Sequence, residues 1–293
     1  DLRIGPDIVR HHTDIYRRLR NTLRFLLGNL AGFDETERLP VEDMPELDRW
    51  VLHRLSELDG KVRQACVDYE FHPLFTELHT FCSVDLSAFY FDIRKDALYC
   101  ERDDSIKRRA VRTVLDEVFS CLTAWLAPFI CFTAEEAWLA RFPGESESVH
   151  LRLFPNIPAD WQDDALAAKW SKIRELRRVV TGALEIERAE KRIGSSLQSH
   201  PVVYTTQAYL DVMAGVDGAE ISITSDITLT ADPAPADAFA IEEVAGVSVV
   251  CALADGEKCG RCYKFLPDVR ADAASSDLCG RCLDAIKFHP AMD

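Results

Sequence analysis

The sequence Cys259-Gly260-Arg261-Cys262 is followed, after sixteen residues, by the near-copy Cys279-Gly280-Arg281-Cys282. Two residues between paired cysteines let both sulfur atoms of a tight turn reach one metal ion, and glycine leaves the backbone free to turn. Two such turns about 15–20 residues apart are typical of a zinc site. An iron centre or two local disulfides are alternatives, but neither accounts as well for the repeated turn. We therefore predict one zinc ion on Cys259, Cys262, Cys279 and Cys282.

The predicted zinc site is structural rather than catalytic. Four cysteine ligands complete a tetrahedron and leave no open position for water or a substrate. The residues around the site are too few to fold by burying apolar surface alone, so the metal has to supply much of their stability. The sequence therefore predicts a zinc-binding module over residues 256–293.

The N-terminal half of the chain has the periodicity of a helical bundle. Apolar residues recur at helical spacing over 7–30, after Pro45, over 74–97 and from Ser105 to Pro128. The pattern Thr133-Ala134-Glu135-Glu136 is typical of a capping box and predicts the start of a fifth helix. Phe71-His72-Pro73 is expected to end the second helix. Five helices with short connections predict a bundle over residues 1–158.

The periodicity changes after this bundle. A long helix is expected from Asp164 to Lys191, inside a linking segment over 159–197. Beyond it, alternating apolar residues predict strands over 200–206, 220–230 and 244–253, with a short helix near 209–213. These elements form a small α+β unit over 198–255. The predicted fold class is therefore mainly α, with a helical bundle, a long linking helix, a small α+β unit and a four-cysteine zinc module.

Composition limits the partners of the chain. The net charge of −15 argues against general attraction to nucleic acid or anionic lipid, so any such contact needs a local basic face. No window of eighteen uncharged apolar residues predicts a membrane span, and the first residues lack a signal-peptide pattern. Because the sequence starts at Asp1 rather than at methionine, we expect it to be a piece of a longer protein. Six further cysteines sit singly in apolar patterns, as reduced core thiols of a cytoplasmic protein do. They are Cys66, Cys82, Cys100, Cys121, Cys131 and Cys251.

Six stretches of the N-terminal half resemble a known family. They are Arg20-Asn21-Thr22-Leu23-Arg24-Phe25, Leu47-Asp48-Arg49-Trp50, Tyr69-Glu70-Phe71-His72, Val84-Asp85-Leu86-Ser87-Ala88-Phe89-Tyr90-Phe91-Asp92, Trp125-Leu126-Ala127-Pro128 and Phe132-Thr133-Ala134-Glu135-Glu136-Ala137-Trp138. In this order they resemble the anticodon-binding domain of bacterial isoleucyl-tRNA synthetases. Arg192-Ile193-Gly194-Ser195-Ser196-Leu197 resembles the junction shared by the isoleucine, valine and leucine enzymes, and the four cysteines resemble the zinc module of the isoleucine enzyme. The resemblance covers the whole chain and is weakest over 200–253.

The resemblance implies part of a ligase rather than a complete enzyme. Class I synthetases hold ATP with a His-x-Gly-His signature and a Lys-Met-Ser-Lys-Ser loop, and neither occurs here. The chain thus resembles the portion that follows the catalytic body, and alone it should not activate isoleucine. ATP and magnesium belong to that missing body. The resemblance also implies isoleucine tRNA as the partner, no DNA or membrane partner, and a cytoplasmic monomer.

The resemblance further implies that the bundle and the zinc module bind the anticodon stem-loop. RNA loops are recognised by stacking and base-edge hydrogen bonds, while cations hold the phosphates. The candidate RNA-binding residues are Arg17, Arg20 and Arg24 on the first helix, Arg177, Arg188 and Lys191 on the linking helix, and Arg261, Lys264 and Arg281 near the cysteines. For the last group, offsetting the negative charge of the zinc site is an equally good explanation. Trp50 is expected to belong to the core rather than to stack on a base.

Two other functions stay open on the sequence alone. Formamidopyrimidine-type DNA glycosylases end in a zinc finger with similar cysteine spacing, which would make this a DNA-binding protein. Those enzymes need a catalytic N-terminal proline and a β-rich first domain, whereas this chain opens Asp1-Leu2 and is predicted to be helical. A zinc-braced scaffold for protein partners is the other alternative.

Overall fold

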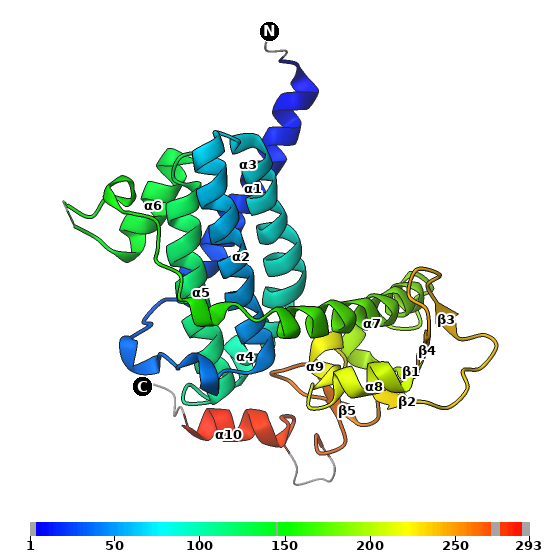
Figure 1. Ribbon diagram of the computed structural model, residues 1–293. Helices are drawn as coiled ribbons and strands as arrows, with labels where there is room; N and C mark the ends of the chain where they lie inside the picture. The colour runs from blue at the N-terminus through cyan, green and yellow to red at the C-terminus, as the bar shows by residue number, and fades with distance from the viewer. Residues whose placement is uncertain (1–3, 145, 271–275, 289–293) are drawn as a thin grey trace. The chain divides into compact units, whose positions relative to one another are not determined.

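The computed structural model describes residues 4–144, 146–270 and 276–288, and the chain divides into two compact units (Figure 1). The first unit comprises residues 1–98 and 103–164. The second comprises the short segment Tyr99–Arg102 and residues 165–293. A piece of the N-terminal half thus packs with the C-terminal residues, a grouping that the sequence did not indicate. The predicted division into four parts stays a prediction.

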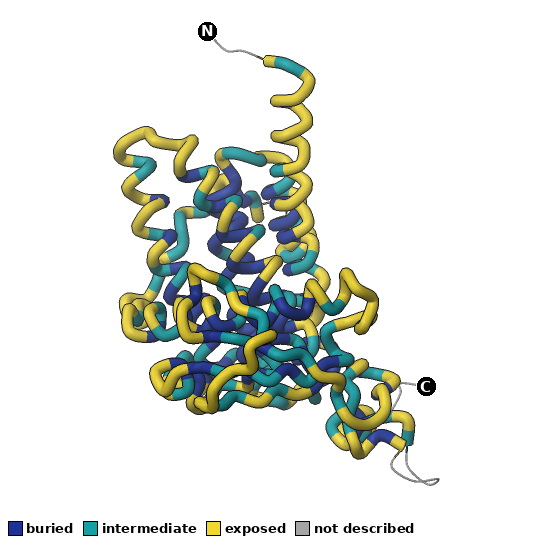
Figure 2. Tube along the Cα trace, turned by 90° about the vertical axis from the view of Figure 1, so that its right-hand side faces the viewer, coloured by how far each residue is buried: buried dark blue, intermediate teal, exposed yellow. Residues whose placement is uncertain are grey.

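The first unit is a helical bundle, as predicted. Its elements are α1 (Pro6–Asn29), α2 (Glu46–Asp68), α3 (Phe71–Thr80), a π-helix (Phe81–Tyr90), α4 (Phe91–Cys100, the last two residues of which group with the second unit), α5 (Ile106–Leu126) and α6 (Cys131–Arg141). Helix α5 is central, because it contacts α1, α2 and α6 and is buried along most of its length. The first turns of α1, beside the N label in Figure 2, are largely exposed. Short 3-10 turns over 35–37, 41–43, 149–151 and 159–161 complete the unit.

The boundary between α2 and α3 differs from the expected one. The chain leaves α2 at Tyr69, which has a left-handed conformation with φ 61°. Helix α3 then begins at Phe71, so Pro73 lies in its first turn. The first backbone N–H groups of a helix have no partner within it, and proline therefore costs little there. The expectation that Phe71-His72-Pro73 would end the helix is wrong by about one turn.

The predicted capping box of α6 is also wrong. Helix α6 begins two residues earlier, at Cys131, and no side chain caps its N-terminus. The Thr133 hydroxyl instead shares a 2.9 Å hydrogen bond with the Tyr16 hydroxyl of α1. The Glu135 carboxylate accepts from the Val149 backbone N–H at 2.8 Å and from the Ser148 hydroxyl at 3.2 Å. The Thr133 hydroxyl, which a local cap would need, is therefore used in a contact with a distant segment.

The second unit joins a long helix to a small sheet. Its elements are α7 (Asp164–Ala189), β1 (Val202–Thr205), α8 (Gln207–Met213), α9 (Gly218–Ser222), β2 (Thr228–Thr230), β3 (Phe239–Ala240), β4 (Val247–Val250), β5 (Glu257–Lys258), β6 (Phe265–Leu266) and α10 (Gly280–Phe288). The larger sheet has the order β2-β1-β4-β3, with β1 parallel to β2 and antiparallel to β4. Helix α7 packs closely on this unit, since a Cβ atom on Gly182 would lie 3.0 Å from the Phe239 ring.

The strand expected over 220–230 is only partly correct. Residues up to Ser222 form α9, whose N-terminus is capped by Asp217 accepting from the Glu220 backbone N–H at 3.0 Å. Only Thr228–Thr230 is a strand. Within this one apolar run, the short helix α9 is followed by the strand β2. Hydrophobic periodicity alone does not distinguish a short helix from a strand.

The six single cysteines differ in burial, and Cys66 and Cys251 are half-buried. Cys82, Cys100 and Cys121 are buried, as expected, and burial raises the pKa of the Cys82 thiol to about 12. Cys131 is exposed, so the core interpretation is wrong for that residue. Among the described residues, no helix is long and apolar enough to cross a membrane.

Candidate zinc centre and nucleic-acid interface

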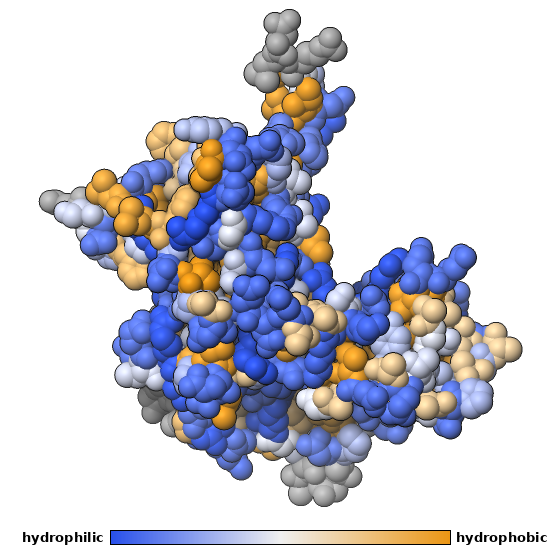
Figure 3. All heavy atoms as spheres, viewed as in Figure 1, coloured by the Kyte–Doolittle hydropathy of each residue, from blue (hydrophilic) through white to orange (hydrophobic). Residues whose placement is uncertain are grey.

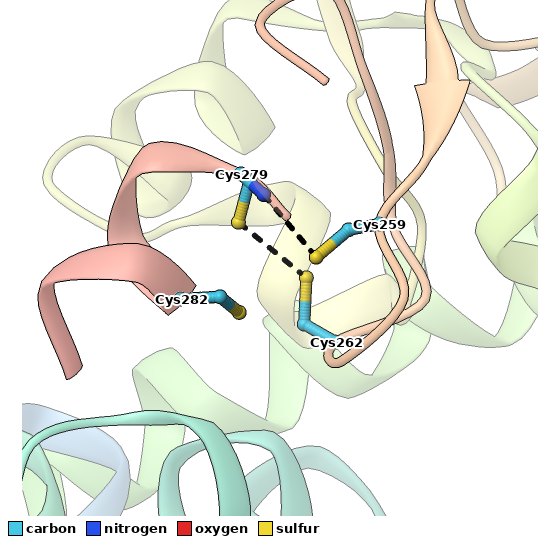
Figure 4. A group of neighbouring side chains, drawn as sticks. All are labelled: Cys259, Cys262, Cys279 and Cys282. Atoms are coloured by element: carbon cyan, nitrogen blue, oxygen red, sulfur yellow. Dashed lines mark hydrogen bonds between the residues drawn. The ribbon is translucent and has the colours of Figure 1, made fainter. Parts of the chain in front are cut away.

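The four predicted zinc ligands come together in the second unit (Figure 4). All four sulfur atoms lie within 4.8 Å of one another, and all four side chains are buried. Cys259 and Cys262 come from the turn between β5 and β6, which closes through Tyr263 with φ 64°. Cys279 and Cys282 come from the start of α10. Two tight turns thus point their thiols at one centre, as the repeated sequence requires.

The geometry of this centre fits a zinc ion. Zinc–sulfur bonds of about 2.3 Å place the sulfur atoms of a regular tetrahedron about 3.8 Å apart. The Cys262 and Cys279 sulfur atoms are 3.8 Å apart. Four soft thiolate donors without an open position suit a closed zinc site.

The surroundings shift the pKa values of different ligand thiols in opposite directions, since burial raises the pKa of Cys262 and of Cys282. Burial opposes ionisation of the Cys259 thiol, but backbone N–H groups of Cys279, Cys262 and Arg261 outweigh it and lower its pKa to about 6. The Cys279 N–H donates to the Cys259 sulfur at 3.4 Å. At the start of α10, the Asp268 carboxylate accepts from the Gly280 N–H at 2.8 Å. These bonds fix the two turns relative to each other and favour thiolate formation at Cys259.

The arginine of each cysteine turn contacts the segment Tyr99–Arg102. The Arg261 guanidinium donates to the Cys100 carbonyl at 2.6 Å and to the Tyr99 carbonyl at 2.9 Å. Both are carbonyls at the C-terminal end of α4, which have no partner within the helix. Arg281 pairs with Glu101 at 2.9 Å. We call this arrangement the arginine clamp, and it gives both arginines a structural role whether or not they also touch RNA.

Arg261→Ala should loosen the arginine clamp. The variant removes two charge-assisted hydrogen bonds, each worth about 1.5–3 kcal/mol when a charged group donates. We expect amide hydrogen exchange in peptides covering 96–103 to accelerate severalfold, while exchange in α5 stays unchanged. Lys264→Ala, which removes a nearby cation outside the clamp, serves as the control. Equal exchange in wild type and Arg261→Ala would contradict the clamp.

The predicted basic residues of α1 lie on one exposed face. Arg17, Arg20 and Arg24 follow one another at helical spacing, and all three are exposed. Arg17 contacts Asp14 at 3.4 Å. Within the described residues, no ion pair engages Arg20 or Arg24, which line a shallow groove of about 150 Å³ between α1 and α6. Glu136 lines the same groove but forms no ion pair with either arginine, so two exposed cations face an anionic ligand beside one carboxylate.

Outside α1, the predicted arginines already have a hydrogen-bond or ion-pair partner within the protein. Arg177 donates to the Ile221 carbonyl at 2.7 Å, and Arg188 pairs with Glu185 one turn away. Lys191 is exposed just past the end of α7, and Lys264 is half-buried beside the cysteine turn. Trp50 is 3% exposed and packs edge-on against Phe89, which confirms its place in the core. Of the nine RNA-binding candidates, Arg20 and Arg24 have the geometry that best suits a phosphate contact.

The first unit also contains a cavity that no sequence pattern predicted. A cavity of about 590 Å³ lies between the C-terminal ends of α1 and α6, and Phe33, Asp116 and Arg141 are among its lining residues. They are widely separated in the sequence and form no motif. Only the packing of the bundle brings them together.

Comparison with known protein families gives one match over the helical bundle and another over the four-cysteine centre. Residues 48–204 match the family described as the anticodon-binding domain of tRNA ligase, and residues 256–285 match the zinc finger found in FPG and IleRS. The second match contains all four cysteines and, together with their clustering, supports zinc binding by this part of the chain. Likeness to FPG is confined to this finger, so the DNA-glycosylase alternative has no support from the rest of the chain.

Similar proteins cover the whole chain. It is 51% identical over 293 residues to the isoleucine–tRNA ligase of Agrobacterium fabrum, covering 100% of this chain and 30% of the relative. The isoleucine–tRNA ligase of Ruegeria pomeroyi is 52% identical over 285 residues, which cover 96% of this chain and 29% of the relative. The isoleucine–tRNA ligase of Caulobacter vibrioides is 50% identical over 293 residues, which cover 99% of this chain and 30% of the relative. The chain thus spans about 30% of the length of these relatives. It belongs to the tRNA ligase family that carries this anticodon-binding domain, and along its whole length it is similar to the C-terminal part of bacterial isoleucine–tRNA ligases.

Proposed function

We propose that this chain binds the anticodon stem-loop of isoleucine tRNA, as one part of an isoleucine–tRNA ligase. The observation that carries the proposal is the pair of exposed arginines, Arg20 and Arg24, which form no ion pair with any described residue and lie on the bundle of a chain matched to an anticodon-binding domain. In the whole ligase, the body that uses ATP and magnesium to attach isoleucine lies outside this chain. We further propose that the ligase is a cytoplasmic monomer and that DNA is not its partner.

The zinc ion has a structural role in this proposal. One ion per chain on four cysteines leaves no position for a reacting group, so it cannot take part in the ligation. Its module would instead hold Lys258, Lys264 and the arginine clamp in fixed positions. Loop contacts from this module could then add base recognition to the phosphate contacts of α1, because phosphate contacts alone carry no sequence information.

The charge distribution of the chain predicts that it binds RNA weakly and in a salt-sensitive way. A chain of net charge −15 repels RNA in general, so only a local basic face can neutralise phosphates. Figure 3 shows hydrophilic residues with several hydrophobic patches among them over the visible face of the bundle. The face of Arg17, Arg20 and Arg24 accounts for at most three phosphates, so the affinity should lie well below that of the complete ligase.

Replacing Arg17, Arg20 and Arg24 together with alanine should weaken binding to all RNAs alike. Each lost phosphate contact lowers the slope of log affinity against log salt by roughly 0.9 for a duplex and 0.7 for a single strand. The measurement is a salt titration with the isoleucine tRNA anticodon arm. Arg10→Ala, which removes an arginine of the same helix already paired with Asp7, is the control. An unchanged slope in the triple variant, or equally tight binding of a DNA duplex of the same length, would refute the proposal.

A further inference from the structure

The segment Tyr99–Arg102 links the two units by its place in the chain. It contains the end of α4 and the start of the connection to α5, yet it groups with the second unit. The chain therefore passes between the units at three places, 98–99, 102–103 and 164–165. Units of one chain move relative to each other unless something holds them together. Whatever keeps this segment in the second unit therefore decides how firmly the two units are joined.

The first cysteine turn holds the beginning of this segment. Arg261 lies inside that turn and donates to the carbonyls of Tyr99 and Cys100, the two hydrogen bonds of the arginine clamp. Hydrogen bonds from a guanidinium are charge-assisted and therefore stronger than neutral ones. The Cys100 side chain is 6% exposed and belongs to the same buried cluster as the four zinc ligands. The end of α4 is thus packed into the metal centre.

Helix α10 holds the rest of the segment. Arg281, Asp284 and Phe288 repeat at the spacing of one helix face. Arg281 pairs with Glu101 at 2.9 Å, and Asp284 pairs with Arg102 at 3.2 Å. The Arg102 guanidinium also lies 4.0 Å from the centre of the Phe288 ring. An exposed ion pair contributes little alone, so the hold comes from the whole set of contacts.

Both sets of contacts depend on an intact metal centre. Helix α10 has nine residues, and helices shorter than about 12–15 residues are marginal in water unless something else stabilises them. Among the described residues of α10, only Cys282 and Ala285 are buried. Two zinc ligands fix its start, since Cys279 directly precedes the helix and Cys282 lies in its first turn. Loss of the metal should therefore release the segment together with α10.

We propose that metal binding at the four cysteines locks the two units to each other through the segment Tyr99–Arg102. When the cysteines hold the metal, the segment is fixed in the second unit and the chain crosses between the units three times. When they do not, the segment returns to the connection between α4 and α5, and the crossing at the start of α7 is left. The arginines of the clamp are positioning residues in this lock. The inference does not depend on RNA binding.

The test measures distances between the two units in the full chain. Spin labels are attached to azide-bearing residues introduced at two exposed positions, Glu70 in the first unit and Asp237 in the second. The ten cysteines of the chain rule out labelling through thiols. Double electron–electron resonance then gives the distribution of label–label distances. We expect a narrow distribution for the zinc-loaded chain and a severalfold broader one after a chelator removes the zinc. The same width in both states would overturn the lock.

A double variant separates the lock from the folding of the metal centre. Arg261→Ala with Arg281→Ala removes the clamp but no zinc ligand, so elemental analysis should still find zinc while the distance distribution is broad. Arg188→Ala is the matched control, because its partner Glu185 lies on the same helix, and it should keep the narrow distribution.

The lock can also be opened from the segment itself. Glu101→Gln with Arg102→Gln removes the partners of α10 and leaves both cysteine turns unchanged, so it gives the same test if the first double variant binds less zinc. We expect this variant to broaden the distribution while zinc stays bound. A narrow distribution in a zinc-loaded double variant of either kind would overturn the lock.

Discussion

Cys259→Ser should release the zinc ion and unfold the residues around it. Apparent zinc-binding free energies in small zinc-finger modules are about 10–16 kcal/mol, and in such modules this energy is folding energy. Apolar burial adds little to this, because among the described residues the cluster at the four cysteines includes, beyond them, Cys100, Val269, Leu266 and Leu278. Loss of one ligand should therefore melt residues 256–288, whereas the bundle of the first unit should keep its own transition.

Three measurements check this expectation. Elemental analysis should find one zinc per wild-type chain and much less in Cys259→Ser. Hydrogen exchange should accelerate across α10 and the β5–β6 turn but not in α5. Cys131→Ser is the matched control, since that thiol is exposed and outside the centre. Iron in place of zinc, or one lowered transition for the entire chain, would contradict the expectation.

The zinc site and the main helices could be predicted because their signals are local. Each cysteine pair lies within four residues, and the two pairs repeat the same turn. Helix α5 has its Ser105 cap and a continuous apolar face, and both are readable from a short window. The start of α6 could not be predicted in this way, because the Thr133 hydroxyl bonds to Tyr16 of α1 instead of capping the helix. Capping patterns read from neighbouring residues cannot identify partners that lie far away in the sequence.

The partners of the arginines were harder to predict for the same reason. A sequence shows where the arginines are, but not which carbonyl or carboxylate each one meets. Arg261 and Arg20 look alike in sequence, yet Arg261 holds the carbonyls of Tyr99 and Cys100 and Arg20 has no ion pair in the described part of the chain. Arg141 gave no signal at all, because the rings around it come from three separate segments.

A buried ion pair lies at the centre of the first unit and has no role in the proposed binding. Asp48 of α2 is 0% exposed and Arg94 of α4 is 2% exposed, and their side chains form an ion pair. The Tyr90 hydroxyl donates to the same carboxylate at 2.6 Å, and the Arg94 Nε at 3.3 Å. Burial raises the pKa of Tyr90 well above its usual range, so the hydroxyl keeps its proton and remains a donor. The network thus joins α2 to the π-helix and to α4.

Asp48→Ala should destabilise the first unit by about 3–5 kcal/mol, the usual cost of leaving a buried charge without its partner. The Arg94 guanidinium would stay in the core without its carboxylate, and the Tyr90 hydroxyl would lose its acceptor. Urea unfolding of the bundle, followed by circular dichroism, measures the loss as a lower midpoint at a similar slope.

Asp92→Ala is the control for this prediction, because it removes a carboxylate of α4 that pairs with Lys95 at the surface. Both of those side chains are more than a third exposed, and exposed pairs contribute at most about 1 kcal/mol. The loss of unfolding free energy in Asp48→Asn should lie between the losses in Asp92→Ala and Asp48→Ala. The amide oxygen can still accept a hydrogen bond from Tyr90, but it carries no charge to pair with Arg94. If Asp48→Ala costs no more than Asp92→Ala, water or another group compensates Arg94, and the network does not hold the bundle together.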